Sequence, residues 1–304
     1  MRGDDGTIVG DVGGLEAQDR AKAGTGWVLL APSLLSLAGM LVALGFLFQF
    51  AFRAFIPGSI LVGSWTLENF ARVLRPLYLE YLLDTALISV YTTILTLVLS
   101  YPVAYALARA RSRAARSCLL ILTLLPFFTG AVIRAYSWIL MLGNEGFING
   151  LLVRLGVIAT PYQLLFTQKG VVIGLVHFSM PVMILILAAA LSHVDPNLER
   201  SAQSLGAGPV RTFWTVTLPL SMPGIVSGSL VIFAWTFSAF PTPALVGGGR
   251  VKMIANVVED LALEAFNWPG GAAFAMVSLV ATFVLIYLLQ RAVPRLAGGD
   301  HEVA

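Results

Sequence analysis

Few residues in this 304-residue chain are of the types that perform chemistry, and their spacing fits no catalytic arrangement. The three histidines, His177, His193 and His301, stand far apart and lack the short spacing usual for metal ligands. The chain contains no phosphate-binding GxxxxGKS or GxxxxGKT segment. Neither a Ser-His-Asp set nor a carboxylate pair occurs at a spacing that indicates a catalytic site. We therefore predict no catalytic residue, no cofactor and no metal site within this chain.

Arg134 is the one charge that lies deep in an apolar segment. A charge in hydrocarbon is costly, so this guanidinium should face protein, water or another subunit. Alternatively, the side chain extends along its segment to the membrane surface, because Arg134 lies about eight residues from the outer end. Both interpretations remain open at this point.

The composition indicates which elements must position these residues. Hydrophobic residues make up 58% of the chain, charged residues 12%, and the mean hydropathy is +0.85. Soluble domains carry about 25% charged residues, so this chain lacks the polar side chains that would cover a soluble globule. The composition therefore predicts an all-α membrane protein. A nucleic-acid partner is not expected, because the net charge is only +3 and no basic face accompanies it.

Six apolar segments are long enough to cross the hydrocarbon core, which needs about 20 helical residues. These predicted transmembrane helices are 27–52, 85–108, 117–142, 170–192, 223–246 and 271–290. Outside them lie a polar tail at 1–26, an extracytoplasmic loop at 53–82 and a second tail at 292–304. Residues 109–116 hold four arginines, and short basic loops stay in the cytoplasm, so both termini are predicted to be cytoplasmic.

Smaller patterns add detail to this arrangement. The extracytoplasmic loops are predicted to contain short amphipathic helices, one through Leu67, Phe70, Val73 and Leu74 and one within residues 252–266. Proline removes a backbone donor, so kinks or breaks in the fourth and fifth spans are predicted at Pro181, Pro241 and Pro243.

The cytoplasmic loop at 193–222 is predicted to be a helix, a glycine turn and a second helix. Asp195 is a good N-cap, and Pro196 fits the first helical turn. Gly206 can adopt the left-handed conformation that ends a helix. The second helix is predicted to begin near Gly208 and to stop before Pro219.

The segment DPNLERSAQSLGAGPVRTFWTVTLPLSMPGI, residues 195–225, resembles the EAA loop of ABC importer permeases. Ala202, Gly206, Leu218 and Pro219 stand at matching positions, whereas the family's Glu-Ala pair falls on Arg200 and Ser201, with Glu199 one residue early. The resemblance implies a coupling helix that sits in a groove of a cytoplasmic ATPase. The residues implied for this role are Asp195, Pro196, Glu199, Arg200, Ala202, Gly206, Ala207, Leu218 and Pro219.

Several other segments are similar to the inner-membrane permease subunit of spermidine/putrescine-type ABC importers. They are YPVAYALAR at 101–109, LLPFFTGAVIRAYSWILMLGNEGFIN at 124–149, PALVGGG at 243–249 and NWPGGAAFA at 267–275. The resemblance implies a type I permease core of five transmembrane helices at 83–291, with the MetI-like fold. It also implies multi-pass insertion in a bacterial inner membrane and uptake of a small hydrophilic solute, polyamine first.

The implied partners are an ABC ATPase dimer, which would bind ATP and Mg²⁺, a second homologous permease and an extracytoplasmic solute-binding protein. If the coupling loop is held by the ATPase, it can pass a displacement to its direct neighbours, the fourth and fifth spans. Three alternatives stay open: a related permease for opines, iron or another solute, a stand-alone secondary transporter, and a structural membrane scaffold.

Residues that would line a solute passage in such a permease are aromatic or charged members of the spans. An ammonium group binds carboxylates and the faces of aromatic rings. The candidates are Asp84, Tyr101, Tyr105, Phe127, Phe128, Arg134, Tyr136, Trp138, Trp235 and Phe240. The alternative is that most of these side chains simply pack inside the helix bundle.

Overall fold

The computed structural model describes residues 12–59 and 62–296. The first of its two compact units ends at Phe50 and consists of helix α1 (Val12–Ala51) almost to its end. Residues 32–51 of α1 are apolar and long enough to span a membrane, as predicted, and most of their side chains are exposed. The helix extends well into the predicted polar tail, because residues 15–23 are mostly good helix formers. Residues 1–11 of that tail lie outside the described residues.

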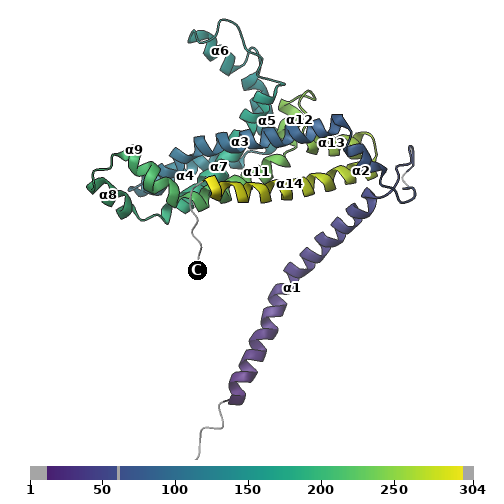
Figure 1. Cartoon of the computed structure of the whole chain (residues 1–304), viewed down its shortest axis with the longest axis horizontal. Coiled ribbons are helices and arrows are strands. Elements are labelled where there is room, and N and C mark those ends of the chain that lie inside the picture. Colours follow the sequence, from purple (N-terminus) through teal and green to yellow (C-terminus); the bar gives the residue numbers. More distant parts are fainter. Residues whose placement is uncertain (1–11, 60–61, 297–304) are drawn as a thin grey trace, which may run out of the picture. The chain divides into compact units, whose positions relative to one another are not determined.

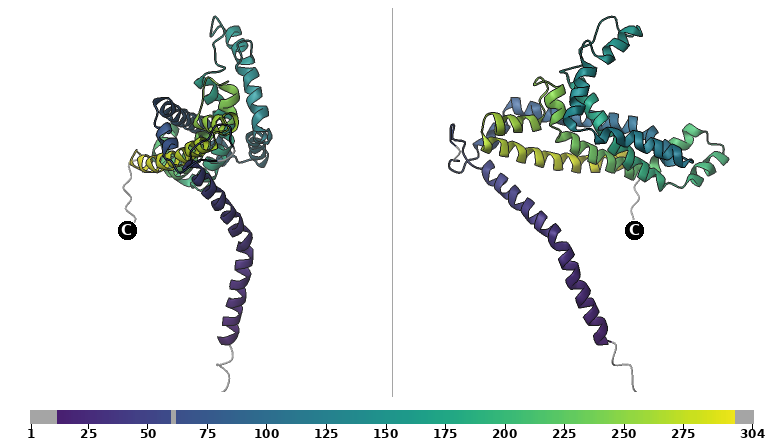
Figure 2. Two further views of the ribbon diagram at one scale, coloured as in Figure 1. Left: turned by 90° about the vertical axis from the view of Figure 1, so that its right-hand side faces the viewer. Right: turned by 180° about the vertical axis from the view of Figure 1, so that it is seen from behind.

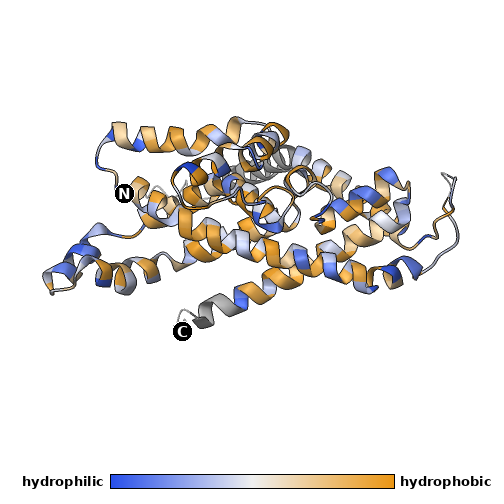
Figure 3. Cartoon of the chain, turned by 90° about the horizontal axis from the view of Figure 1, so that it is seen from above, coloured by the Kyte–Doolittle hydropathy of each residue, from blue (hydrophilic) through white to orange (hydrophobic). Residues whose placement is uncertain are grey.

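The second unit is a helix bundle with α3 (Pro76–Arg109), α7 (Gln168–Ser192) and α11 (Met222–Phe237) at its centre (Figures 1 and 2). Helix α14 (Trp268–Leu296) packs against α11. Large apolar side chains such as Leu187 and Ile232 fill the core between these helices. The long helices are predominantly hydrophobic (Figure 3), as a membrane protein requires.

Small polar residues form a buried stripe along α3. Ser89, Thr92, Thr96 and Ser100 are each fully buried, at spacings of three or four residues that place them on one face of the helix. Helix α3 packs against both α7 and α11. Small side chains let helix backbones approach closely in a membrane, and this stripe serves that purpose.

Four helices in the described part of the chain are long and apolar enough to cross a membrane, and two bent helix pairs bring the number to six. Predicted span 117–142 is wrong as one continuous helix. The chain forms α4 (Arg113–Leu124), a 3₁₀ turn η1 (Leu125–Phe128) and α5 (Ala131–Leu142). The helical segments 113–128 and 131–154 are bent by 96° relative to each other at this point. Pro126 and Gly130 stand at this break, where they weaken helical continuity.

The predicted fifth span, 223–246, is also interrupted. Helix α11 ends at Phe237, and α12 (Pro241–Val246) begins after a short break. Pro241 occupies the first position of α12, where its missing N–H leaves no bond unmade. The predicted break at Pro241 is confirmed, whereas Pro181, where a kink or break was also predicted, stands inside α7, which is not broken there.

The remaining helices of the second unit are shorter. The predicted amphipathic helices are confirmed as α2 (Glu68–Val73) and α13 (Ile254–Glu259), which continues into a π-helical turn, η3 (Asp260–Glu264). Helix α6 (Phe147–Arg154) follows α5, and both project from the bundle (Figures 1 and 2). Asp84, predicted at the edge of a span, lies about two turns inside α3, because that helix already begins at Pro76.

Candidate coupling site and solute passage

The first arm of the predicted coupling loop, α8 (Pro196–Ser204), is capped at both ends as predicted. The Asp195 side chain accepts a hydrogen bond of 2.9 Å from the Asn197 backbone N–H. At the other end, Gly206 has φ +89°, a conformation that L side chains rarely adopt. The N–H of Ala207 then returns to the Ala202 carbonyl at 3.0 Å. The loop therefore turns sharply at a position that requires glycine.

The second arm is longer than predicted. It comprises α9 (Pro209–Thr212), a π-helical segment η2 (Phe213–Thr217) and α10 (Leu218–Leu220), followed by a bend of 66° into α11. The predicted stop before Pro219 is wrong. Pro219 stands in the first turn of α10, where a backbone donor is not needed, so the helical path continues to Ser221.

Glu199 of α8 points inward and is only 8% exposed. Its Oε1 atom accepts hydrogen bonds from Arg109 Nη2 at 2.8 Å and from Thr217 Oγ1 at 3.0 Å, and Oε2 accepts one from the Tyr105 hydroxyl at 3.1 Å. Burial by itself would raise the pKa of this carboxyl. The hydrogen bonds from Arg109 and Thr217 and the charge of Arg109 nevertheless hold the pKa below its ordinary value. Glu199 is therefore ionised and paired at neutral pH.

Arg109 belongs to the same network and ends α3. Its Nη1 atom donates to the carbonyl of Val194 at 3.0 Å and, more weakly, to that of Leu191 at 3.4 Å. These carbonyls lie at the C-terminal end of α7, where a positive charge is stabilised. One guanidinium thus joins α3, the end of α7 and the coupling loop.

Tyr101, Tyr105 and Arg109 stand four residues apart and therefore lie on one face of α3. The Tyr101 hydroxyl is 2.8 Å from Ser221 Oγ, at the bend between α10 and α11. Two of the residues predicted for the solute passage therefore lie where α3 meets the coupling loop. Arg109, Thr217 and Ser221 were not among the predicted site residues. The sequence signal that could have indicated Arg109 is its four-residue spacing from Tyr105, which itself follows Tyr101 by four residues.

Several apolar side chains of the loop are exposed. Leu205, at the turn, is 89% exposed, and Val210 and Trp214 on the second arm are 71% and 62% exposed. Arg200, which replaces the usual glutamate, is exposed and lies 3.4 Å from the Asn197 side chain. The loop thus has a buried polar cluster toward α3 and exposed apolar side chains at Leu205 and Val210, whereas Trp214 lines a cavity with Tyr101 and Tyr105 of α3.

Arg134 lies in α5 just after the break and is 8% exposed. Its Nη2 atom donates to the Thr129 carbonyl at 2.7 Å, and its guanidinium lies 4.7 Å from the centre of the Phe178 ring. Its Nε and Nη1 atoms are buried and have no hydrogen-bond partner among the described residues. Arg134 thus satisfies a carbonyl that the broken helix leaves free.

A cavity of about 410 Å³ lies in the angle between η1, α5 and α7. Arg134, Trp138 and His177 line it, and Trp138 Nε1 lies 3.4 Å from His177 Nδ1. Aromatic side chains continue from it, since Phe178 packs edge-on against Trp235 at 5.0 Å and Trp235 against Phe127 at 6.4 Å.

The structure therefore brings together four of the predicted passage residues, Phe127, Arg134, Trp138 and Trp235. The others lie apart from this group. Phe128 and Tyr136 are 84% and 56% exposed, and Phe240 stands at the break between α11 and α12. Asp84 is half-buried on α3.

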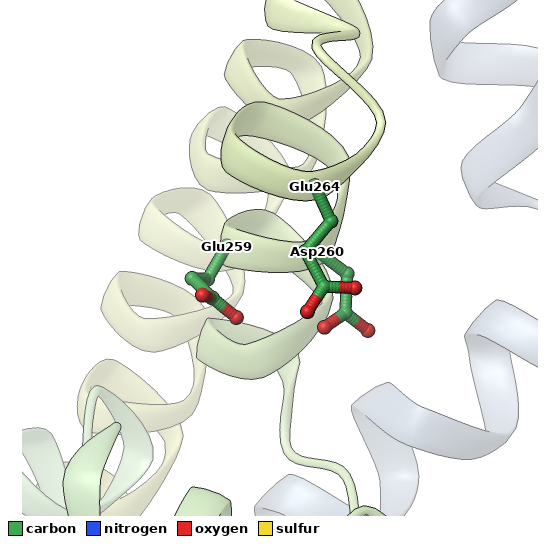
Figure 4. A group of neighbouring side chains, drawn as sticks. All are labelled: Glu259, Asp260 and Glu264. Carbon is green, nitrogen blue, oxygen red and sulfur yellow. The ribbon is translucent and has the colours of Figure 1, made fainter.

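Three carboxylates meet on the outer segment α13–η3, as Figure 4 shows. Oxygen atoms of Glu259, Asp260 and Glu264 all lie within 4.8 Å of one another. Asp260 forms an ion pair with Lys252, and this hydrogen bond raises the pKa of the Lys252 ammonium group. One of the three negative charges is therefore already neutralised within the chain.

Residues 96–298 match the sequence model of the family described as the inner membrane component of binding-protein-dependent transport systems. The chain belongs to this family. The match covers the later part of the second span, the third to sixth spans and the coupling loop, and it confirms the family that the sequence motifs indicated. The protein is therefore a multi-pass inner-membrane permease subunit of an ABC importer rather than an enzyme.

Curated relatives of this permease cover most of its length. The spermidine/putrescine transport system permease protein PotB of Escherichia coli strain K12 is 34% identical over 252 residues, which are 78% of this chain and 91% of the relative. The protein of the same name from Haemophilus influenzae is 35% identical over 227 residues, 75% of this chain and 79% of the relative.

A solved structure of a bacterial alginate ABC transporter, in complex with an alginate pentasaccharide-bound periplasmic protein, contains a chain with the same fold. The TM-score is 0.73 at 16% identity, with 92% of this permease and 98% of that chain covered. The fold prediction, an all-helical MetI-like permease, is confirmed.

Proposed function

We propose that this permease forms one half of the passage of an ABC importer that takes up a polyamine such as spermidine or putrescine. The observation that carries the proposal is the 34% identity to a spermidine/putrescine permease over 78% of the chain.

The coupling loop would receive the ATPase. The loop exposes Leu205 and Val210, and apolar side chains of this size favour burial against a partner. ATP and Mg²⁺ would be bound by the ATPase dimer, and hydrolysis would take place there. This assignment places the loop and both termini in the cytoplasm.

The other partners would be a second homologous permease in the membrane and a solute-binding protein on the extracytoplasmic side. The predicted domain boundaries follow from this arrangement, with the loop between Arg53 and Tyr81 outside the membrane. A binding protein that delivers the solute would also supply most of the selectivity, because the described spans carry few charges.

Uptake by the complete importer in proteoliposomes tests the solute. Radiolabelled spermidine should enter only with ATP inside the vesicles and with binding protein outside, and unlabelled putrescine should compete. Uptake of an opine or of iron without uptake of spermidine contradicts the polyamine assignment. Flux through the purified single chain under an ion gradient, without an ATPase, contradicts the importer assignment.

Leu205→Glu tests the docking face. Because Leu205 is 89% exposed, the substitution leaves the permease fold intact, yet it places a charge in the proposed interface. The ATPase should then no longer co-purify with the permease. Val157→Glu, at another exposed apolar residue in the loop after α6, is the matched control and should retain the ATPase. Equal retention by both variants contradicts docking at this face.

A further inference from the structure

The coupling loop is joined by the backbone to α7 and α11 alone, yet its strongest side-chain contacts lead to α3. Glu199 and Arg109 lie 90 residues apart in the sequence and form an ion pair of 2.8 Å. Their side chains are only 11% and 17% exposed. A helix remote in sequence is thus held to the loop by a buried charge pair.

This pair resists separation for a physical reason. Three donors converge on the Glu199 carboxylate, and Arg109 also bonds to two carbonyls at the end of α7. Pulling the pair apart would leave two buried charges without compensation. Under a load from the ATPase, α8 and the end of α3 should therefore move as one body.

A second contact lies two turns away along the same face of α3. Tyr101 meets Ser221, which is fully buried at the bend where the loop enters α11. Two contacts on one helix face restrain rotation as well as translation of α3 relative to the loop. A single contact would leave the helix free to pivot.

Helix α3 is also built to shift against its neighbours. Its buried stripe toward the bundle consists of small side chains, and the hydroxyls of Thr92, Thr96 and Ser100 have no hydrogen-bond partner among the described residues. Along this stripe few specific bonds would break if α3 shifted against α7 and α11, and the bonds of α3 to these helices lie at the loop end, through Tyr101 and Arg109.

We propose that Arg109 and Glu199 are positioning residues that make α3 a third transmission helix, which moves with the coupling loop in each transport cycle. The sequence predicts transmission only to the fourth and fifth spans, α7 and α11. This inference rests on the proposed docking of the ATPase to the loop.

The test measures whether α3 follows the loop in the complete importer. Spin labels replace Leu99 on α3 and Gln203 on α8, both exposed, in a Cys118→Ser background that removes the free cysteine. The distance between the labels is compared in the nucleotide-free and vanadate-trapped states. It should stay constant in the otherwise unchanged chain and change by more than about 2 Å in Glu199→Gln.

Two further variants separate transmission from simple stabilisation. Arg109→Lys keeps a positive charge beside Glu199 and beside the carbonyls at the end of α7, so its label distance should stay closer to constant than that of Glu199→Gln. Arg111→Gln, exposed and two residues beyond α3, should behave as the parent chain. A distance that changes equally in the parent and Glu199→Gln overturns the inference, as does an Arg109→Lys variant no different from Glu199→Gln.

Failure of the underlying function gives a different result. If the parent permease does not retain the ATPase at all, both the proposed docking and this inference are wrong. If the ATPase is retained and the vanadate-trapped state forms, only the label distances decide the role of α3. If Glu199→Gln retains less of the ATPase subunit, but the distance between the labels stays constant in the complexes that remain, transmission through α3 is also contradicted.

Discussion

Arg134 is buried and Arg109 is largely buried, but the two side chains have very different partners. Arg109, at the cytoplasmic end of α3, has a carboxylate and two backbone carbonyls as partners. Arg134, beside the break between α4 and α5, has one carbonyl and the face of one ring. Its remaining nitrogens are buried without hydrogen bonds, whereas for Arg109 this is true only of Nε.

The difference follows from what each region must do. The proposed role of the coupling loop is to transmit a displacement without yielding, and a network of several charge-assisted bonds is stiff. The region around Arg134 contains a cavity and loosely contacting rings, and a solute path must rearrange easily. The environment of each charge therefore fits its proposed role, Arg109 in the joint of the coupling loop and Arg134 beside the solute passage.

The largest effect is expected for Arg109→Met. It leaves Glu199 buried without its ion partner, which costs about 3–5 kcal/mol for a typical buried pair. The thermal unfolding temperature of the detergent-solubilised permease should fall sharply, and ATPase co-purification should fall with it. Arg111→Met, at an exposed neighbour, should leave both unchanged. Equal stability of the two variants would show that the Arg109–Glu199 pair does not stabilise the joint between α3 and the loop.

Gly206→Val should have the next largest effect. A valine at φ +89° costs about 1–2 kcal/mol of backbone strain, although a Cβ meets no other atom within 4 Å. The loop should therefore reshape while the spans stay folded, and ATP hydrolysis should become uncoupled from uptake. Gly208→Ala, with φ −68° and equally open space, is the control. Normal coupling in Gly206→Val would show that the loop geometry is not essential.

Tyr101→Phe tests the second contact of the joint. It removes the hydroxyl that meets Ser221 and should cost about 0.5–1.5 kcal/mol, the net value of one hydrogen bond. A drop of a few degrees in thermal unfolding temperature is expected. Tyr287→Phe, at a half-exposed ring, should cause none. A loss as large as that in Arg109→Met would mean that the tyrosine, not the ion pair, holds the joint.

The smallest effect on stability is expected for Arg134→Met. The change removes a poorly compensated buried charge and keeps a long side chain against Phe178, so the free energy of unfolding should change by less than about 1 kcal/mol. Its thermal unfolding temperature should stay close to that of the parent. A destabilisation comparable to Arg109→Met would place Arg134 in a network as complete as that of Arg109.

Much of the fold follows from local rules and could be predicted. The apolar segment 170–192 matches α7 within two residues, and the short helices α2 and α13 follow the predicted amphipathic patterns. The predictions failed where helices break. Around Pro126 and Gly130, hydropathy stays high through the break, so a pattern based on apolar residues cannot detect it.

The site was predictable to a different extent on its two faces. The caps at Asp195 and Gly206 depend on backbone preferences of single residues, and both predictions are confirmed. The inward direction of Glu199 depends on Arg109, 90 residues earlier, and no local rule connects them. For the same reason, the tyrosines predicted for the passage could not be assigned to the joint beforehand.

The sequence by itself determined the membrane class, the six apolar segments and the turn of the coupling loop, because hydropathy and backbone propensity act over short stretches of chain. Only the tertiary structure decided which of the few charges are paired. Burial makes an unpaired charge costly, so the partner of each one depends on which distant helices pack together. Arg109 meets a carboxylate through the packing of α3 beside the loop, and Arg134 meets only a carbonyl and a ring.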